Sequence, residues 1–564
     1  MSNGRALRGS VLTLVFGGLV LPILAGAVQT LGAAFNLHAV GGTISLQPWR
    51  DMWALPGFGT SLRISLVTGV GSTVLALLLA TGLCATLHGR VSPALSNRML
   101  TPILAVPHAA LAIGFAFLIA PSGWIARLIA PLFGWHNPPD LASVNDANGV
   151  ALLIGLTIKE LPFLLLVILS ALRQLPVTQH LSAARALGYG HGIAWIKIIM
   201  PQVWPLIRLP VLVVQAYALS AVDMAVILGP SNPPTLAVAT MRWFFSPDLQ
   251  MILPASAAAV IIAALTAIVC ALWLFAEICG RRAGLLWLRR GGRGLSSEPL
   301  LRTASALALT ALTLGLFALL AMAIWSLAFR WSFPALLPES WSLRAWVNPG
   351  AGLGRAAVAS LALGVTTSVL ALGLAVAWLE AEDRGGYRRA GWATGLIYLP
   401  LLLPQIGFLF GLNLVFLQLR IAPGWGAVIW AQSLFVFPYV MIALSDPWRA
   451  LDPRLIRTAA ALGAGPVRRL FAVKLPALLA PLLTALAIGF AVSVAQYLPT
   501  LFMGAGRIAT LTTEAVTLSS GSDRRVIGAF GVLQAALPFA AYLAALVVPR
   551  ALYRNRRALL GGME

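Results

Sequence analysis

Polar and charged side chains are rare in this chain, so the few that fall inside apolar segments are the first candidates for chemistry. Lys159 and Glu160 stand together in the segment IKELPF, and Asp223 lies in the segment SAVDMAVILGP. Gln496 and Tyr497 occupy a comparable apolar segment later in the chain. A charged side chain at the centre of a bilayer costs roughly 2.5–3.5 kcal/mol, so such residues usually face a cavity or a partner. These side chains could relay protons, contact a transported solute or join two helices.

Sequence spacing separates some of these roles. Adjacent helical residues point in different directions, so Lys159 and Glu160 are not each other's natural partners. For this pair, an interhelical contact, or a helix loosened by the proline that follows, is favoured over a proton relay or a contact with the solute on a translocation path, although both of these stay open. For Asp223, and for Gln496 with Tyr497, two roles stay open: lining of a translocation path and a polar contact between helices.

The sequence shows no constellation expected of a metal centre or an enzyme active site. His108 stands alone, with no second His or Cys at metal-ligand spacing. Cys84, Cys270 and Cys279 lie in or beside apolar segments, without a CxxC pair or a disulfide framework. The chain has only three lysines, and none follows a glycine, as a phosphate-binding loop requires. We therefore expect no catalytic residue, no metal and no cofactor.

The composition places these residues in a membrane. The chain has 564 residues, of which 59% are hydrophobic and 10% are charged, and its mean hydropathy is +0.89. Soluble domains average about 45–50% apolar and about 25% charged residues. A chain this apolar must expose much of its surface to lipid. The net charge of +22 does not indicate nucleic acid, because the arginines mark the ends of apolar segments instead of forming one stripe.

Twelve apolar segments are each near the ~20 residues that a helix needs to cross a bilayer. We expect helices, because only a helix closes its hydrogen bonds within one segment in lipid. The first segment has the Arg5, Arg8 and AGA features of a cleavable signal peptide. Its apolar stretch continues to about Phe35, however, so we expect an uncleaved span. The segments are 11–35, 62–87, 99–120, 150–172, 205–229, 251–279, 304–328, 355–379, 393–418, 426–446, 477–498 and 527–549.

Positive charge alternates along the loops. With the N-terminus inside, most Lys and Arg residues fall in cytoplasmic segments, as the positive-inside bias requires. We therefore expect a multi-pass membrane protein with both termini in the cytoplasm. The basic, Gly-rich segment 281–299 predicts a cytoplasmic linker between two six-span halves. The strongest clusters are Arg281, Arg282, Arg289, Arg290 and Arg293; Arg384, Arg388 and Arg389; and Arg550, Arg554, Arg556 and Arg557.

The two halves are related in sequence. SLVTGVGSTVLAL (65–77) matches SLALGVTTSVLAL (360–372) at 8 of 13 positions, an offset of 295. Gly114 recurs as Gly411 at an offset of 297, and a third segment recurs at an offset of 275. Equivalent segments have the same ordinal position and the same orientation. We therefore expect a parallel repeat about a pseudo-two-fold axis along the membrane normal.

The segment that recurs at the offset of 275 is a cytoplasmic loop, and its two copies lie at about 176–203 and 452–477. Each begins with an Ala-rich stretch that favours a helix. A glycine then interrupts it, Gly188 in the first loop and Gly463 in the second, where a chain reversal is easiest. A proline opens the span that follows. The pattern predicts a short helix, a turn, a second short helix and then a span, with a small-residue face that can enter a groove on another protein.

These loops resemble the cytoplasmic signature loop of binding-protein-dependent ABC importer permeases. That pattern is Glu-Ala-Ala, three residues, Gly, nine residues and Ile-x-Leu-Pro, and the glycine-to-proline spacing of 13 is kept in both copies. The chain departs from the pattern at the Glu position of both copies and at the first Ala of the second copy. A role for the acidic side chain is therefore not carried over. The matched residues are Ser182, Ala183, Ala184, Gly188 and Pro201, and Arg457, Thr458, Ala459, Gly463 and Pro476.

The resemblance covers most of the chain and extends to the fused two-half permeases of the iron(III)/thiamine type. It implies an all-α membrane protein, a polytopic bundle of two parallel-repeat halves of the type I ABC importer permease kind. The halves are expected at 1–280 and 304–564, joined by a linker at 281–303.

The resemblance also implies a place in the bacterial inner membrane, partners and a mechanism. The two loops would be coupling helices that dock on two copies of a separate cytoplasmic ATPase. An external binding protein would deliver a small solute, and the halves would move it by alternating access, without bond-making chemistry in this chain. The substrate stays open among iron(III), thiamine, another small cation and an oxyanion.

An ion-driven secondary transporter with twelve spans is the alternative. The segment AEDRGGYRR (381–389) resembles a loop of major facilitator transporters, but it occurs once, and a basic loop on the inside explains it. The doubled Ala-Ala…Gly…Pro loop favours the importer permease.

Overall fold

Most of the chain that the structure describes is helical. The computed structural model describes residues 9–37, 44–88, 106–291, 293, 297–347, 352–385, 391–521 and 523–553. Among these residues the one sheet is a hairpin of two short strands, in which β1 (Ala328–Arg330) pairs antiparallel with β2 (Ser340–Trp341). The predicted all-α fold class is confirmed.

The helices follow one another with short connections. In the first half they are η1 (Thr13–Val20), α2 (Leu21–Ala34), α3 (Gln47–Ala54), α4 (Phe58–Leu87), α6 (His108–Ile119), α7 (Trp124–Phe133), α8 (Val150–Arg173), α9 (Val177–Ala186), α10 (His191–Ala194), η2 (Trp195–Ile199), α11 (Met200–Ser220), α12 (Asp223–Leu228), α13 (Leu236–Phe244), η3 (Leu249–Met251) and α14 (Ile252–Arg289). In the second half they are α15 (Glu298–Leu327), α16 (Arg344–Val347), α17 (Leu353–Gly385), α18 (Gly391–Leu402), α19 (Ile406–Gln418), α20 (Trp425–Arg449), α21 (Pro453–Ala461), α22 (Pro466–Arg469), η4 (Leu470–Lys474), α23 (Leu475–Ala477), α24 (Leu479–Ala495), α25 (Leu498–Gly504), α26 (Leu511–Leu518) and α27 (Arg524–Leu552).

The candidate membrane spans agree with the hydropathy profile. Within the described residues, ten stretches of helix are long and apolar enough to cross a bilayer, and two bent pairs bring the number to as many as 12. The bent pairs are α18 with α19, which meet at 102°, and the α22–α23 segment with α24, which meet at 79°. Each of the twelve predicted segments overlaps one of these stretches or pairs, although residues 99–105 of the third lie outside the described residues.

The sequence repeat is also a structural repeat. In the first half the backbone N–H of Leu236 donates to Ser65 Oγ at 2.8 Å. In the second half the N–H of Leu511 donates to Ser360 Oγ at 2.8 Å. The two donors are related by the offset of 275 and the two acceptors by the offset of 295, so the same bond ties the second span to the same late helix in both halves.

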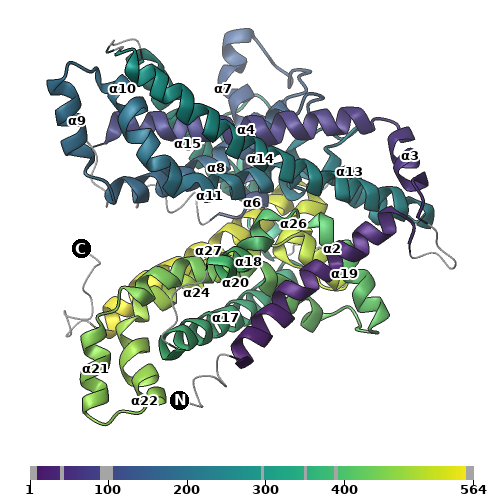
Figure 1. The fold of residues 1–564 in the computed structure, drawn as a ribbon. Helices are drawn as coiled ribbons and strands as arrows, with labels where there is room; N and C mark the ends of the chain where they lie inside the picture. The colour runs from purple at the N-terminus through teal and green to yellow at the C-terminus, as the bar shows by residue number, and fades with distance from the viewer. Residues whose placement is uncertain are drawn as a thin grey trace.

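The first span of each half packs against the other half. In Figure 1, α2 lies among the helices of the second half, and α15 lies beside α4 in the first. α2 packs on α19, and in the same way α15 packs on α6, while each also contacts the last helix of its own half, α14 or α27. The two halves therefore exchange their first spans.

Two equivalent glycines permit this exchange. A Cβ added at Gly411 of α19 would overlap the Gly26 carbonyl of α2, and a Cβ added at Gly114 of α6 would overlap the Ala318 carbonyl of α15. Small residues let helix backbones approach closely in membranes, where packing rather than water drives association. The repeat of Gly114 as Gly411 in the sequence thus marks the two places where the halves cross.

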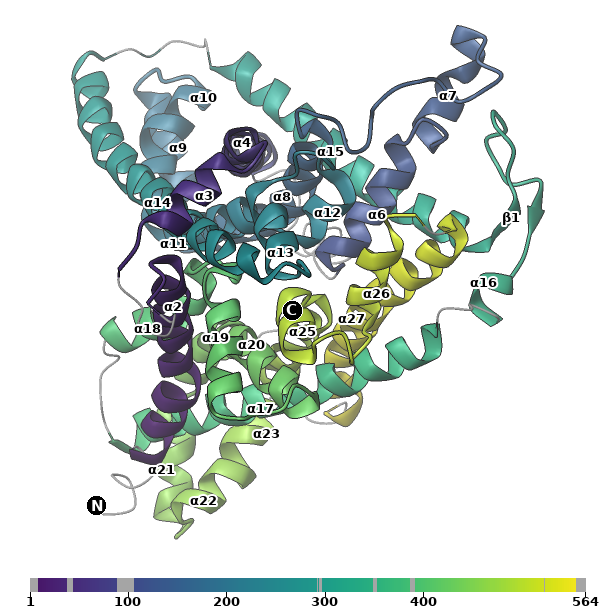
Figure 2. The same ribbon diagram turned by 90° about the vertical axis from the view of Figure 1, so that its right-hand side faces the viewer.

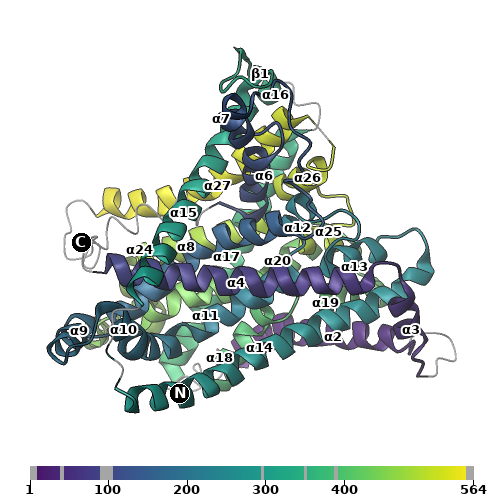
Figure 3. The ribbon, with the colours of Figure 1, turned by 90° about the horizontal axis from the view of Figure 1, so that it is seen from above.

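A buried arginine joins the halves at another edge of the molecule. Figure 2 and Figure 3 show α7 beside the β1–β2 hairpin of the second half. Arg127 of α7 is 2% exposed, and its guanidinium donates to the carbonyls of Ser332 and Ala335 at 2.7 and 2.6 Å. The ring of Trp331 lies 4.7 Å from the guanidinium carbon. These bonds and the ring contact compensate for burying the charge.

The connection between the halves is more helical than the sequence suggests. α14 continues to Arg289 and α15 begins at Glu298, so helix extends into both ends of the expected linker at 281–303. The division of the chain at this linker stays a proposal.

The crossing of α2 and α19 can be tested by adding a single methyl group. We expect Gly411→Ala to force the two helices apart and to destabilise the protein by about 1–3 kcal/mol, as overpacking does. Gly407→Ala on the same helix is the control, because its added Cβ meets nothing closer than Ala263 at 3.6 Å. Thermal unfolding of the purified proteins in detergent measures both, and equal midpoints for the two variants would show that the crossing is not tight.

Candidate functional site

The first loop folds as two short helices around Gly188. The N–H of Gly188 donates to the Arg185 carbonyl at 2.9 Å, and the N–H of Tyr189 donates to the Ala184 carbonyl at 3.0 Å. Gly188 has φ +78°, a left-handed conformation that a residue with a side chain rarely adopts. The glycine therefore ends α9 and reverses the chain into α10, as the sequence predicts.

The second loop repeats this geometry around Gly463. Its N–H donates to Ala460 and that of Ala464 donates to Ala459, both at 3.0 Å, and Gly463 has φ +81°. The repeat extends further, because η2 and η4 are both π-helical and stand at the offset of 275. π-helical segments are rare in proteins, but those that occur often lie at functional sites.

The two loops lie at the same end of the bundle, at the left of Figure 1. The residue before each glycine is an exposed leucine: Leu187 is 59% exposed and Leu462 is 82% exposed. Exposed apolar side chains on two equivalent tips offer contact area to a partner at that end.

The predicted loop residues differ in accessibility. Ala184 is buried and packs under the loop, so it holds α9 in place and is not available for docking. The exposed residues are Ser182, Ala183, Gly188 and Pro201 of the first loop and Arg457, Thr458 and Gly463 of the second, while Ala459 and Pro476 are half-buried. Most of the pattern thus faces outward.

A cavity of about 150 Å³ lies between the two halves. α6, α11 and α12 form one wall, and residues of α18, α20, α24 and α25 form the other. Asp223, Gln496 and Tyr497, which the sequence selected from separate segments, all line it. The other polar lining residues are His108, Tyr217, Ser220, Gln405 and Tyr439.

The cavity lies where the fifth span of each half is interrupted. α11 ends at Ser220 and α12 begins at Asp223, while α24 ends at Ala495 and α25 begins at Leu498. The two breaks coincide at the offset of 275. Non-helical backbone at membrane depth is tolerated only where protein or a cavity surrounds it. Discontinuous helices of this kind form solute sites in transporters.

The polar groups of the cavity are partly committed to one another. Asp223 is buried, and the Tyr217 hydroxyl donates to its Oδ1 at 3.0 Å. The Tyr217 ring lies 4.4 Å from the ring of His108. Within the described part of the chain, Gln496 Oε1 has no hydrogen-bond donor. A carboxylate and an open amide oxygen are groups that can contact a polar solute or a water molecule.

Lys159 and Glu160 lie behind the wall of this cavity. Glu160 Oε1 is 3.4 Å from His108 Nε2, and Lys159 Nζ donates to the Val106 carbonyl at 2.5 Å. Both contacts connect α8 to the start of α6, which is the interhelical role that the sequence favoured. α8 remains continuous through Pro162.

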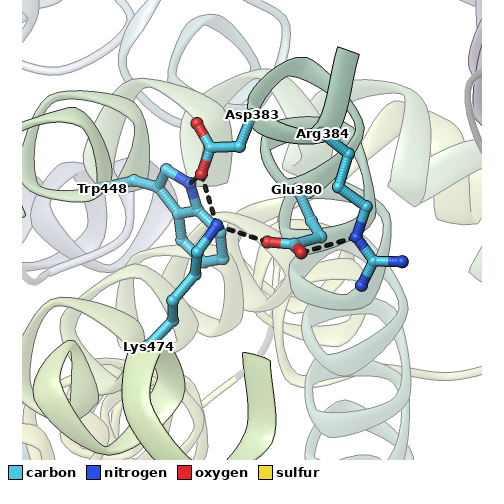
Figure 4. Close-up of polar contacts among 5 residues, drawn as sticks. All are labelled: Glu380, Asp383, Arg384, Trp448 and Lys474. Carbon is cyan, nitrogen blue, oxygen red and sulfur yellow. Dashed lines mark hydrogen bonds and ion pairs between the residues drawn. The ribbon is translucent and has the colours of Figure 1, made fainter. Parts of the chain in front are cut away.

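A cluster of charges fixes the second loop to α17 (Figure 4). Lys474 Nζ lies 2.6 Å from Glu380 Oε2 and 2.5 Å from Asp383 Oδ2. The side chains of Lys474 and Glu380 are each 5% exposed. Arg384 binds the other oxygen of Glu380 at 2.7 Å, and the Trp448 indole N–H donates to Asp383 at 3.0 Å. The ion pair is therefore buried and hydrogen-bonded on several sides.

Sequence reasoning missed this cluster. A basic inside loop is an incomplete explanation of 381–389, because its acidic residues form specific bonds; residues 386–389 lie outside the described part. The available signal was the placement of Glu380, Glu382 and Asp383 within four positions of a chain that has 17 acidic residues.

In the first half, different chemical groups connect the loop to the second span. The His191 Nε2–H donates to the Ala85 carbonyl at 2.8 Å, a bond that fixes the tautomer because a carbonyl only accepts. The rings of His88 and Trp195 lie 5.9 Å apart at the same junction. Burial, together with the nearby His191, lowers the pKa of His88 below its ordinary value. This junction uses imidazole and indole groups where the second half uses an ion pair.

These features define a class: a helical membrane transport protein with an internal cavity and two equivalent loops at one end of the bundle. Residues 370–555 match the family model described as a binding-protein-dependent transport system inner membrane component. The chain is similar to the inner membrane ABC transporter permease protein YnjC of Escherichia coli, with 32% identity over 89% of this chain and 90% of YnjC.

Shorter relatives match part of the chain. The molybdenum transport system permease protein ModB of Haemophilus influenzae is 29% identical over 24% of this chain and 66% of its own length. The putative 2-aminoethylphosphonate transport system permease protein PhnV of Salmonella typhimurium is 27% identical over 30% of this chain and 65% of its own length.

The chain belongs to the family of binding-protein-dependent ABC transporter permeases, as a fused two-half member. Permeases of this family work with an ATPase and a binding protein. The chain is thus a multi-pass transport protein, and the expected resemblance is confirmed.

The bond between Tyr217 and Asp223 can be tested with one substitution. Tyr217→Phe removes the hydroxyl that donates to the buried carboxylate, and we expect a loss of about 1–2 kcal/mol in stability. Tyr439→Phe, at another tyrosine of the same cavity, is the matched control, and we expect it to unfold within about 0.5 kcal/mol of the unmutated protein. Thermal unfolding in detergent makes the comparison, and equal losses in both variants would contradict the assigned bond.

Proposed function

We propose that this chain is the permease of an ATP-driven importer, which moves a small solute from an external binding protein to the cytoplasm by alternating access. The two loops at 176–203 and 452–477 would each receive one copy of a separate ATPase. The single observation that carries this proposal is the repeated helix–glycine–helix geometry of the two loops at one end of the molecule.

The loops have the properties that docking requires. Both reverse at a glycine with positive φ, and both place an exposed leucine at the tip. Two equivalent surfaces suit two copies of one partner, because a pseudo-two-fold repeat presents the same patch twice. This supports Ser182, Ala183 and Gly188, with Arg457 and Thr458, as docking residues.

The cavity supports a translocation path between the halves. It is closed by residues of both halves, so a change in the angle between them would open it to one side of the membrane or the other. Asp223, Gln496 and Tyr497 are the proposed contacts for the solute, and Lys159 and Glu160 would support the wall behind them. The names of the relatives indicate different solutes, so no substrate is carried over from them.

Reconstitution into vesicles tests the proposal against the ion-driven alternative. The chain would be purified with the ATPase and the binding protein encoded beside it, and uptake of the ligand bound by that binding protein would be measured. We expect uptake to require ATP inside and binding protein outside. Uptake by the chain alone, driven by a proton or sodium gradient, would overturn the proposal.

Gly463→Val tests the docking role of the second loop. Valine is strained at φ +81°, so the turn would rearrange, while the open space around the site leaves the packing unaffected. We expect normal membrane insertion but weaker co-purification of the ATPase, and Gly465→Val, with φ −64° at the same loop, is the control. Co-purification of the ATPase with Gly463→Val at the unmutated ratio would count against docking.

Labelling from each side of the membrane tests the orientation. In a variant without the three native cysteines, Leu462→Cys should react with an impermeant maleimide in inside-out vesicles and not in intact cells. Leu337 is 60% exposed in the β1–β2 hairpin. Leu337→Cys should react with the maleimide in intact cells and not in inside-out vesicles. The reverse pattern would place the termini outside.

A further inference from the structure

We propose that a tether between each loop and the second span of its half positions the coupling loop, and that Lys474, Glu380 and Asp383 are the positioning residues in the second half. The inference rests on the proposed function, since it assigns how loop movement reaches the spans. His191 with the Ala85 carbonyl is the corresponding tether in the first half.

The second loop needs such a tether because it is not continuous with its span. The α22–α23 segment meets α24 at a bend of 79° at Leu478. In the first half, helix runs without such a bend from His191 to Ser220. A loop joined through a bend can rotate without moving its span, unless another contact holds it. Lys474 lies four residues before the bend, where a contact to α17 restricts that rotation.

The contacts at Lys474 join several elements. Its ammonium binds α17 through Glu380 and Asp383 and lies 5.3 Å from the ring centre of Trp448 at the end of α20. A second bond connects the same two helices, because Arg449 lies 2.9 Å from Glu382. The end of α20, just before the loop, and Lys474, near the end of the loop, are therefore both fixed to the last turns of α17. α20 in turn reaches the cavity through Phe435 and Tyr439.

The two tethers contact equivalent positions on the second spans of the two halves. At the offset of 295, Glu380 corresponds to Ala85, whose carbonyl accepts from His191. At the offset of 275, His191 corresponds to Pro466, whose side chain has no hydrogen-bond donor, and Lys474 corresponds to Ile199, which is fully buried. Different residues on the loops therefore reach the same place on the second span.

Packing alone does not explain the ion pair. Ala85 and Ile199, two buried residues of one hydrophobic cluster, stand at the corresponding positions in the first half. Replacing a buried ion pair by apolar residues is often neutral for stability. The charged version adds directional bonds that an apolar contact lacks. This difference allows stability and positioning to be measured separately.

The test uses substitutions that import the first-half residues. Glu380→Ala with Lys474→Ile removes the ion pair but keeps an apolar junction, and adding Pro466→His supplies the imidazole of the first-half tether. Lys474→Ile alone removes the buried cation, so that Glu380 keeps only Arg384 and Asp383 keeps only the Trp448 indole N–H among these partners. Arg302→Gln, in an exposed pair with Glu298, is the control for losing a charge.

Amide hydrogen exchange in the purified permease measures the tether without any partner. We expect the double variant to unfold near the unmutated temperature, yet to exchange about tenfold faster in residues 453–474, as loss of a charge-assisted contact predicts. Exchange in 177–199 should not change, and the triple variant should recover protection. Unaltered exchange in 453–474 of the double variant would overturn the tether.

Transport per ATP hydrolysed measures positioning. With the ATPase and the binding protein, we expect the double variant to bind the ATPase as the unmutated chain does, and the complex to hydrolyse ATP at about the unmutated rate. Uptake per ATP should fall about tenfold, with partial recovery in the triple variant. If the double variant takes up as much solute per ATP hydrolysed as the unmutated protein, the ion pair serves stability alone. Failure of the unmutated chain to couple uptake to ATP would instead remove the proposed function and leave the exchange result standing.

Discussion

The interruption of the two fifth spans is the constraint on which the rest of the structure depends. Backbone groups left unpaired inside a bilayer find no partner in lipid, so protein must enclose them. The breaks that follow Ser220 and Ala495 face each other, and helices from both halves surround them. Enclosure requires the halves to approach closely, which the glycines at 114 and 411 allow. The cavity, the polar residues that line it and the tight crossings are consequences of that one requirement.

A second consequence concerns distance. A helix of ~20 residues extends about 30 Å, and α11 runs from the first loop to the first break as one such piece. Under the proposed function, movement at the first loop would reach the cavity along a nearly rigid path. In the second half the bend at Leu478 interrupts this path, and the buried contacts of Lys474 with α17 offer a parallel one.

The sequence predicts what depends on local pattern. Span positions follow from hydropathy, and the turns at Gly188 and Gly463 follow from a glycine after an Ala-rich helix. Asp223, Gln496 and Tyr497 were selected because they are polar residues within apolar segments, but the sequence left open whether they line a path or join helices. The contacts of Lys474 were not predictable, because they join segments far apart and fall at a position where the other half has Ile199. The exchange of first spans was also hidden, because hydropathy identifies a span without identifying its neighbours.

That exchange has a consequence for how the chain is made. α2 is synthesised before the helix it packs on, so its site against α19 does not exist until the third span of the second half has entered the membrane. α15, in turn, completes a body whose other helices are already in place. Neither half can reach its final packing before the other arrives, so assembly is mutual and late. Covalent fusion keeps both partners at hand during that interval and fixes them at a ratio of one to one.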